Sequence, residues 1–318
     1  LPEMLLTWAG QRDEYKESMI QYRSDGNRAK TQYYHTRQWV KKIQSNSLYG
    51  VLLLPSFRFY NKDNGEGITT SSQSLIQFTM KYGNMFYNNI TKKGLDYCIC
   101  ADTDSNFFSA VPILEVENPQ YANTSDEQIA DTTIAIATRL QTAINKAYDI
   151  YAKRFHNCSK HYFKIKQENV ASSGLWIAKK NYAQWLINKD GKPVPPEDSL
   201  DIKGLSVVRS NFPKSFRSIL KQMLIDILHD KPKEYISENL VNFKKQIDKS
   251  PIEDIMVPTG VKEISKYNPL DRNLFKFTKG SPAHVKAAIA YNDFLKFKNL
   301  TGYKTIEDGD KIVWAYLQ

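Results

Sequence analysis

The sequence predicts an α+β protein in which long helices accompany short antiparallel strands. Three patterns predict this class. Two long helix-permissive stretches open the chain, apolar segments flank an acidic turn near residue 103, and helices dominate after Pro213. With 318 residues, of which 41% are hydrophobic, the chain is long enough to bury a core in two or three lobes.

The opening stretches predict a helical hairpin. Helix-permissive residues run from Pro2 to about Arg23, and the polar run 24–27 favours a stop. A second helix is expected over 29–48, with Gly50 as its C-cap. Because the loop between the two helices is so short, the helices must lie antiparallel.

The remaining elements follow from the alternation of apolar and polar residues, which favours strands, and from the 3.6-residue repeat, which favours helices. In the first half we expect a strand over 57–60, a turn over 61–65, a helix over 71–88, and strands over 95–100 and 106–110. In the second half we expect a helix over 126–155, strands over 162–166, 174–177 and 182–188, a Pro-rich loop over 192–196, helices over 213–229, 231–248 and 282–298, and a closing strand over 311–317.

Composition narrows the classes of partner. The 44 Lys and Arg residues against 34 Asp and Glu give a net charge of +10, which favours a polyanion. No apolar run is long enough for a membrane span, the start has no signal peptide, and no helix has the aromatic face of a membrane-surface protein. Three cysteines form no disulfide framework, and Cys98 and Cys100 are expected to be small core residues in an intracellular protein.

An acidic pair lies between the two strands predicted at 95–100 and 106–110. Asp102 and Asp104 are two residues apart on a tight turn, where their mutual repulsion favours binding of a divalent cation. Carboxylate oxygens select hard ions such as Mg²⁺ or Mn²⁺. The alternative is an ordinary turn in which the side chains only cap their own backbone. Taken alone, the pair leaves both interpretations open.

One face of the predicted second helix carries polar residues that could bind a ligand. Lys42, Asn46 and Tyr49 are spaced four and three residues apart, and therefore share one helix face. Arg12 and Lys16 have the same spacing on the first helix, so antiparallel packing could bring both basic faces onto one ligand. A cation, an amide and an amphipathic ring suit a triphosphate, a base edge and a minor groove. The alternative is a solvated basic face with Tyr49 in the core.

The order of these motifs resembles that of the family B DNA polymerases. The motifs are Leu1-Pro2-Glu3 with Gln11-Arg12, Lys42-x-x-x-Asn46-Ser-x-Tyr49-Gly50, Tyr97 to Asp102-Thr103-Asp104-Ser105, Lys179-Lys180-Asn181-Tyr182-Ala183, and Lys203-Gly204-Leu205 with Arg209-Ser210. The nearest likeness is to replicative polymerases of T-even-like phages, although the hairpin is shorter here. Reverse transcriptases, by contrast, carry paired aspartates.

The resemblance implies a right-hand polymerase architecture and a role for each matching residue. Residues 1–53 would be the fingers hairpin, 54–204 the palm and 205–318 a mainly helical thumb. Asp104 would be the principal ligand of two Mg²⁺ ions (Mn²⁺ may replace them), with the Thr103 carbonyl nearby and Asp102 and Glu168 as secondary acids. Arg12, Lys16, Lys42 and Asn46 would hold the dNTP, and Tyr49 would lie under the nascent base pair. Lys179, Lys180, Tyr182 and Arg209 would contact primer–template DNA.

A basic segment supports the expectation of a sequence-independent grip on DNA. Between residues 153 and 182 there is one acid, Glu168, against seven cations, which are Lys153, Arg154, Lys160, Lys164, Lys166, Lys179 and Lys180. Such a surface neutralises phosphates whatever the base sequence.

Part of the family pattern does not occur in the sequence. The first metal-binding aspartate of the family lies in an Asp-x-x-Ser-Leu-Tyr-Pro-Ser motif, and neither this motif nor the exonuclease domain is found. We therefore expect the chain to be inactive alone and to need a polypeptide supplying both. A natural two-chain enzyme and a trimmed fragment both stay open, as does a non-catalytic DNA-binding module with a polymerase-derived fold. The resemblance places the protein in the cytoplasm of a phage-infected bacterium.

Overall fold

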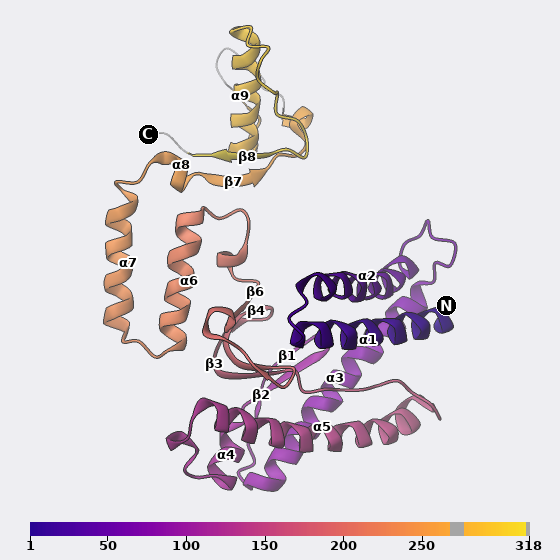
Figure 1. The fold of residues 1–318 in the computed structure, drawn as a ribbon. Coiled ribbons are helices and arrows are strands. Elements are labelled where there is room, and N and C mark those ends of the chain that lie inside the picture. Colours follow the sequence, from indigo (N-terminus) through magenta and orange to yellow (C-terminus); the bar gives the residue numbers. More distant parts are fainter. Residues whose placement is uncertain (268–276, 316–318) are drawn as a thin grey trace. The chain divides into compact units, whose positions relative to one another are not determined.

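A computed structural model describes residues 1–267 and 277–315. It confirms the α+β class, because long helices accompany three small antiparallel sheets (Figure 1). The chain forms two compact units, each considered separately below. The first comprises Leu1–Met85 and Leu95–Phe107, and the second comprises Phe86–Gly94 and Phe108–Gln318. Among the described residues, no helix is both long and apolar enough to cross a bilayer.

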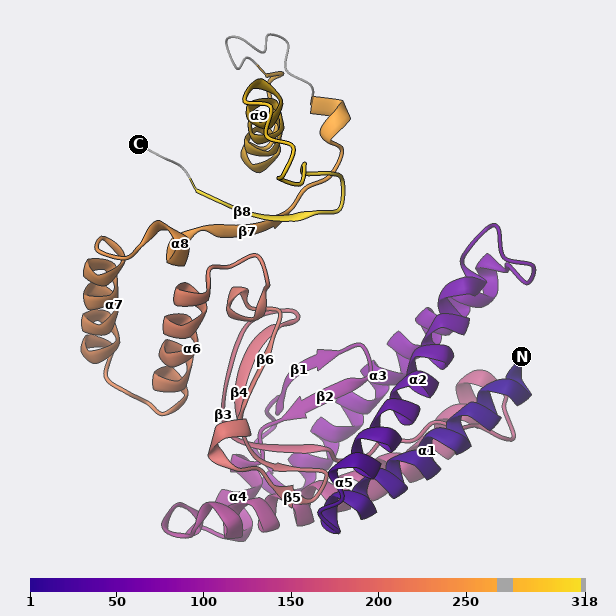
Figure 2. The ribbon, with the colours of Figure 1, turned by 45° about the horizontal axis from the view of Figure 1, so that its top comes forward.

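The first unit opens with the predicted helical hairpin. Helix α1 (Pro2–Ser24) and helix α2 (Arg28–Leu52) pack against each other along their lengths (Figure 2). The Asn27 side chain starts α2 by accepting a hydrogen bond from the Lys30 backbone N–H at 3.1 Å. The predicted cap at Gly50 is wrong, because α2 continues to Leu52 and Leu53 is its C-cap.

Helix α3 (Lys62–Thr91) corrects two expectations. The strand predicted at 57–60 is a series of turns, and the turn predicted at 61–65 is already the start of α3. The Asn61 side chain accepts the Asn64 N–H at 2.8 Å, which helps to satisfy the first turn. The Leu53 side chain packs directly against Gly65, so a Cβ atom at this position would require Leu53 to shift. Gly65 therefore permits close packing at the helix start, where sequence rules favour a turn.

The predicted strand–acidic turn–strand hairpin is confirmed. Strand β1 (Cys98–Asp102) pairs with strand β2 (Ser105–Phe108). Asn84, on α3, fixes the entry to β1, since its side chain bonds both the Asp96 carboxylate at 2.6 Å and the Tyr97 backbone N–H at 2.8 Å. The strand therefore leaves α3 at a defined point, and the acidic turn follows it.

The second unit is organised around helix α5 (Asp126–His156), which matches the predicted helix at 126–155. A capping box between Ser125 and Gln128 starts it. Its buried residues recur at helical spacing and are Ala130, Ile136, Leu140, Ile144, Ala147, Tyr148, Tyr151 and Ala152. A short helix not expected from the sequence, α4 (Val111–Glu117), is tied to α5 by an ion pair of 2.6 Å between Glu117 and Arg139.

The 3₁₀ turn η1 (Tyr121–Asn123) lies between α4 and α5, and a second set of strands follows α5. Strands β3 (Asn169–Ala178) and β4 (Asn181–Lys189) form an antiparallel hairpin, and β4 also pairs with β5 (Lys192–Pro193) and β6 (Leu200–Lys203). The strands predicted over 174–177 and 182–188 are thus confirmed, with β3 longer than expected. The 3₁₀ turns η2 (Pro196–Asp198) and η3 (Ser206–Val208) flank β6.

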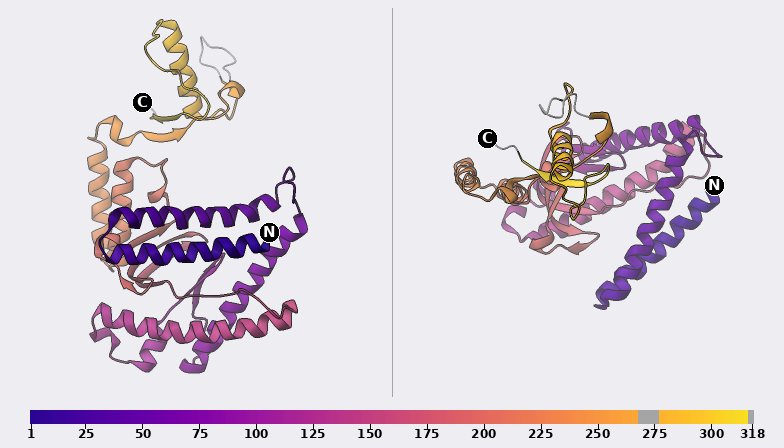
Figure 3. Two further views of the ribbon diagram at one scale, coloured as in Figure 1. Left: turned by 45° about the vertical axis from the view of Figure 1, so that its right-hand side comes forward. Right: turned by 90° about the horizontal axis from the view of Figure 1, so that it is seen from above.

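The prediction of a strand over 162–166 is wrong, because these residues pair with no strand. Their backbone instead bonds side chains of α5, and Asn145 joins both the N–H of Ile165 (2.9 Å) and its carbonyl oxygen (3.0 Å). Figure 3 shows this segment running back alongside α5. Sequence alternation predicts the extended conformation, but it does not reveal which partner bonds the backbone.

The last part of the second unit is helical, as predicted, with one small sheet. Its elements are α6 (Lys214–Leu228), α7 (Lys233–Ile247), α8 (Ile252–Ile255), β7 (Val257–Gly260), η4 (Ile264–Tyr267), α9 (Ala283–Phe297) and β8 (Lys311–Trp314). Strand β7, which was not expected, pairs with β8. Val261, Val285, Ala288 and Ile289 form the local core. The end of the predicted strand 311–317 lies outside the described residues.

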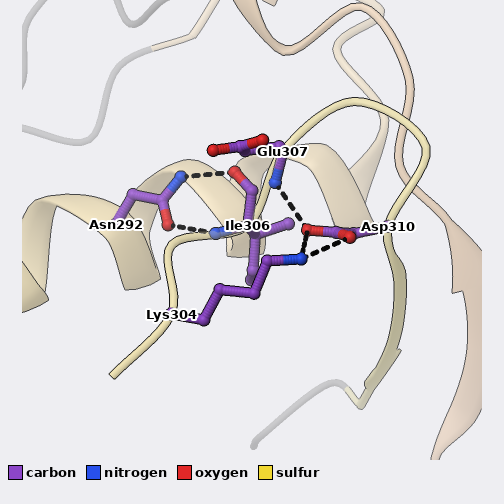
Figure 4. Close-up of polar contacts among 5 residues, drawn as sticks. All are labelled: Asn292, Lys304, Ile306, Glu307 and Asp310. Carbon is purple, nitrogen blue, oxygen red and sulfur yellow. Dashed lines mark hydrogen bonds and ion pairs between the residues drawn. The ribbon is translucent and has the colours of Figure 1, made fainter. Parts of the chain in front are cut away.

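A polar clamp joins α9 to the chain before β8 (Figure 4). The Asn292 side chain donates to the Ile306 carbonyl at 2.9 Å and accepts from the Ile306 N–H at 2.8 Å. Nearby, the Glu307 N–H and Lys304 together lower the pKa of the Asp310 carboxyl. The clamp fixes the path of a segment that has few buried side chains of its own.

Replacing Asn292 with alanine should lower the free energy of unfolding of this unit by about 1–3 kcal/mol, because it leaves two half-buried backbone groups of Ile306 without partners. Urea denaturation followed by circular dichroism measures the change. Lys296→Ala, which replaces an exposed residue of the same helix that makes no bond to Ile306, is the control and should change the value by less than about 0.5 kcal/mol. Equal effects of the two substitutions would contradict the role of the clamp.

Candidate functional site

The acidic turn at the end of β1 presents hard oxygen ligands. Thr103 adopts the left-handed backbone conformation (φ 48°), and the Asp104 N–H donates to the Asp102 carbonyl. The Thr103 hydroxyl also bonds the Asp102 carboxylate at 3.1 Å. Asp104 is exposed and Asp102 is half-buried. The turn therefore displays the Asp104 carboxylate to solvent while its neighbours hold the Asp102 carboxylate in place.

The two carboxylates and the Thr103 carbonyl have the donor chemistry that Mg²⁺ prefers. They form an incomplete set, since residues 1–267 and 277–315 contain no group of three or more His, Cys, Asp or Glu side chains arranged for a metal ion. Glu168, the third predicted acid, is an exposed residue of the second unit. The turn alone therefore supplies only part of the ligand set that a hard divalent cation takes.

Cys98 lies on β1, four residues before the first acid of the turn. Burial, and then the neighbouring Asp96 carboxylate, raise the pKa of its thiol to about 11. The thiol is half-buried and contacts the Cys100 carbonyl, which agrees with the predicted core role, whereas Cys158 is exposed. Because folding favours the neutral thiol, its contribution to stability is present below the ordinary pKa of 9.0 and is lost as the pH rises toward about 11.

Iodoacetamide at pH 8 should therefore modify Cys158 at least about tenfold faster than Cys98, because the thiolate is the reactive form. Peptide mass spectrometry after timed quenching measures both rates in one sample. In urea the two thiols should react at similar rates. If Cys98 reacted as fast as Cys158 in the folded protein, the raised pKa would be refuted.

The predicted face of α2 is present and exposed. Lys42 and Asn46 are exposed one helical turn apart, and Tyr49 is half-buried. The Lys42 ammonium lies 5.5 Å from the ring centre of Trp39. Trp39 was not predicted as part of this face, although its spacing of three residues from Lys42 places the two side chains on the same side of the helix. Helix α2 contains five Lys and Arg residues and no Asp or Glu, so the whole helix is suited to an anionic ligand.

The partner residues on α1 are partly enclosed. The Arg12 side chain is half-buried, and its Nε atom is buried with no hydrogen-bond partner. Lys16, one turn further along α1, is also half-buried. A buried guanidinium nitrogen without a partner is costly to leave unbonded, so an anion reaching Arg12 would relieve that cost.

Tyrosines join α1 and α2 near the hairpin loop. Tyr22 stacks on Tyr34 with ring centres 5.5 Å apart, and Arg37 lies over Tyr33 and Tyr15 at 4.7 and 5.5 Å. The hydrogen bond that Arg37 donates to the Tyr15 hydroxyl raises the pKa of the guanidinium, and the electrostatic effect of Tyr33 raises it further. We call these five residues the tyrosine cluster. It holds the two helices together where α1 has no buried residue.

A second group of cations lies at one end of the β3–β4 hairpin. Lys179 and Lys180 form its turn, and Lys180 has a left-handed backbone (φ 61°). Lys203 pairs with Tyr182 at the start of β4, and the next residue, Gly204, approaches the turn closely. A Cβ atom on Gly204 would lie 1.9 Å from the Lys180 carbonyl oxygen.

Arg209 belongs to the same group, since it donates to the Gly204 carbonyl at 3.2 Å. Lys179, Lys180 and Arg209 are exposed, as expected of phosphate contacts. Tyr182 differs, because its ring is only 7% exposed and stacks on Trp176. The structure therefore brings together four residues that are separated by up to thirty positions in sequence, and it gives Tyr182 a packing role in supporting the turn.

The fold and these two groups define an α+β protein with an acidic turn and exposed cations suited to polyphosphate ligands and divalent metals. The chain belongs to DNA polymerase family B, whose sequence model matches residues 1–293. It is 24% identical over 88% of its length to the DNA-directed DNA polymerase of Enterobacteria phage T4, and 26% identical over 61% to that of Escherichia phage RB69. It is also 24% identical over 90% to the DNA polymerase alpha catalytic subunit of Xenopus laevis.

The chain spans less than a third of the length of these relatives. It covers 31% of the T4 polymerase, 22% of the RB69 polymerase and 16% of the Xenopus subunit. The match of the family model over residues 1–293 confirms the family assignment that was inferred from the motifs.

Proposed function

We propose that the chain is the catalytic fingers, palm and thumb part of a template-directed DNA polymerase that adds dNTPs to a primer 3′-hydroxyl. The fingers would be residues 1–53, the palm 54–204 and the thumb 205–318. One observation carries the proposal. The acidic turn and the Lys42–Asn46 face belong to the same compact unit, although more than fifty residues separate them in sequence. Metal ligands and triphosphate ligands must share one body to act on one nucleotide.

The proposed roles follow from charge and exposure. Asp104, with Asp102 and the Thr103 carbonyl, would hold Mg²⁺, which when bound supplies activation of the primer hydroxyl and neutralisation of charge on the phosphates. Lys42, Arg12 and Lys16 would bind the triphosphate, Asn46 would donate its amide to the nucleotide, and Tyr49 would support the base pair. Glu168 is proposed as a supporting acid.

The cations of the second unit are proposed to bind DNA without regard to sequence. Gly204 lies against the Lys179–Lys180 turn and accepts a hydrogen bond from Arg209, so the three exposed cations come from one small region of the surface. Such a patch suits the phosphates of a primer–template duplex. Tyr182 would act by packing beneath it. We place this activity in the cytoplasm of a phage-infected bacterium, in keeping with the two phage relatives.

The first metal-binding aspartate and the exonuclease would come from residues outside this sequence. The 318 residues contain no Asp-x-x-Ser-Leu-Tyr-Pro-Ser motif. Assayed on primed DNA, the chain alone should therefore extend a primer little, and addition of a polypeptide carrying that motif should restore extension. Robust extension by the chain alone would contradict this part of the proposal.

Nucleotide binding tests the site without requiring turnover. Lys42→Ala should weaken Mg²⁺-dependent dNTP binding by the chain about tenfold, because it removes a charge-assisted contact to the triphosphate. Isothermal calorimetry with and without Mg²⁺ gives the two dissociation constants. Lys41→Ala is a matched control, since the Lys41 ammonium lies 5.9 Å from the Trp8 ring and should contribute less than twofold.

The same titration separates the catalytic interpretation from the alternative one. A non-catalytic DNA-binding module would bind primer–template DNA but show no gain in dNTP affinity from Mg²⁺. The proposed polymerase should lose that gain in Asp104→Ala. If Asp104→Ala kept the full gain, the assignment of the metal to the acidic turn would be refuted.

A further inference from the structure

Helix α9 is apolar around most of its circumference. Only three of its fifteen residues carry a Lys, Arg, Asp or Glu side chain. One side of the helix packs on the local core through residues that are 5% exposed or less, and these are Val285, Ala288, Ile289 and Leu295. A helix that is apolar on both sides is normally covered on both. The side of α9 opposite the core is therefore the one to consider as a contact surface.

That opposite side carries a regular row of apolar residues. The row consists of Ala283, Ala287, Ala290, Phe294 and Phe297, which are spaced four, three, four and three residues apart. This repeat of 3.5 residues is the one that forms the contact line between two packed helices. We call these five residues the outer seam. Phe294 is 51% exposed and Phe297 is 81% exposed, although rings of this size are normally buried. The outer seam is therefore suited to a second helix.

The outer seam is flat at one end and raised at the other. Three alanines occupy its N-terminal half, where small side chains allow another helix to approach closely. Two phenylalanines occupy its C-terminal half and stand out from the helix surface. In an antiparallel pair of identical helices, the large half of one therefore meets the small half of the other, and the side chains can interdigitate.

One register satisfies every layer of such a pair. Placing Ala287 against the second copy's Phe297 sets Ala290 against the second copy's Phe294, and two-fold symmetry repeats both contacts. Tyr291, beside the centre of the pair, would then meet its own equivalent, and two such rings can stack. A parallel pair would oppose phenylalanine to phenylalanine and alanine to alanine, which gives a clash at one end and a void at the other.

The charges near the outer seam permit this pairing. Asp293 is the one acid of α9, and it lines a cavity with Asn292 and Lys296 on the side of the helix that faces the core. Lys298 follows the end of the seam, with its ammonium 5.3 Å from the ring centre of Phe297. No member of the seam itself is charged, so covering the seam removes no charge of its own from water.

We propose that two copies of this chain pair antiparallel through the outer seams of α9. The contact uses none of the residues proposed to bind metal, nucleotide or DNA, so it goes beyond the proposed function and does not depend on it. The core residues of α9 lie on the opposite side of the helix, so each copy keeps its own packing. A single pair of helices of this length is smaller than a standard stable interface, and we expect a reversible dimer with a Kd on the order of 10–100 µM.

Sedimentation equilibrium of the whole chain tests the proposal. Between about 1 and 300 µM, a range that brackets the expected Kd, the average mass should rise from that of one chain toward that of two. Phe297→Ala opposes alanine to alanine and should weaken pairing at least about tenfold. Ala287→Phe opposes phenylalanine to phenylalanine and should weaken it to a similar degree. Phe155→Ala, at a 63% exposed position of α5 in the same unit, is the control and should change nothing.

An equimolar mixture of the two weakened variants gives the sharpest result. In a mixed antiparallel pair, the phenylalanine introduced in one chain meets the alanine introduced in the other, and the unchanged positions pair as before. The mixture should therefore dimerise within about threefold of the original chain. Circular dichroism verifies that both variants, which are changed at exposed positions, remain folded. A chain that stays monomeric at every concentration, variants that dimerise as well as the original chain, or a mixture that pairs no better than its components would overturn the proposal.

Discussion

Asp104→Asn should lower the rate of primer extension at least about 10²-fold in a polymerase assembled from this chain and a polypeptide carrying the missing aspartate. The substitution preserves the size of the side chain but removes the negative charge that would hold the cation at the acidic turn. The exposed position of Asp104 means that the fold should be unaffected. Single-turnover extension of labelled primer measures the effect, and circular dichroism verifies the fold.

Asp102→Asn is the matched comparison. Its carboxylate already accepts a hydrogen bond from Thr103 and is half-buried, so it is less available to a cation. We expect a loss of about tenfold or less. Raising the Mn²⁺ concentration should recover part of the activity of both variants. A larger loss with Asp102→Asn than with Asp104→Asn would reverse the assignment of the principal ligand.

Gly204→Ala should lower the free energy of unfolding of the second unit by about 3–5 kcal/mol. Two effects combine. The backbone at Gly204 has a φ of +69°, which costs an L-residue about 1–2 kcal/mol. The new Cβ would also lie 1.9 Å from the Lys180 carbonyl oxygen, a backbone atom that can yield only if the Lys179–Lys180 turn moves.

Gly191→Ala separates the two effects. Gly191 has a comparable φ of +79° but nothing within 4 Å of the position of a Cβ, so its substitution should cost only about 1–2 kcal/mol. Urea denaturation of both variants gives the difference, which is the contribution of the close approach. If the two substitutions lowered the free energy of unfolding equally, the close approach of Gly204 to the turn would contribute nothing to the cost of Gly204→Ala. Because the turn presents two of the proposed DNA contacts, Gly204→Ala should also weaken binding of duplex DNA.

The sequence predicted helices α1 and α5 closely. A polar stop marks the end of α1, and the apolar residues of α5 recur at helical spacing. The start of α3 was missed because Gly65 and Gly67 favour a turn locally, whereas packing of Leu53 against Gly65 favours the helix. Local propensity was overridden there by tertiary contact.

The candidate site was predictable only as residue types and spacings. The shared face of Lys42 and Asn46 follows from helical geometry, and both are exposed. The burial of Tyr182 and the approach of Gly204 to Lys180 depend on the register of β4 against β6, which no local pattern specifies. The two hydrogen bonds between the Asn145 side chain and the Ile165 backbone could not be predicted either. The alternation of apolar and polar residues predicts a neighbouring strand there, but a side chain of α5 takes its place.

The tyrosine cluster has a consequence for how the hairpin responds to ionic strength. The cluster joins α1 and α2 through rings and a guanidinium rather than through carboxylates, and such close contacts are little screened by salt. The exposed cations of α2 would bind phosphates by charge attraction, which added salt weakens steeply. A rise in salt would therefore release an anionic ligand while the two helices stay together, so the grip of the hairpin could be switched off and on again without the hairpin unfolding.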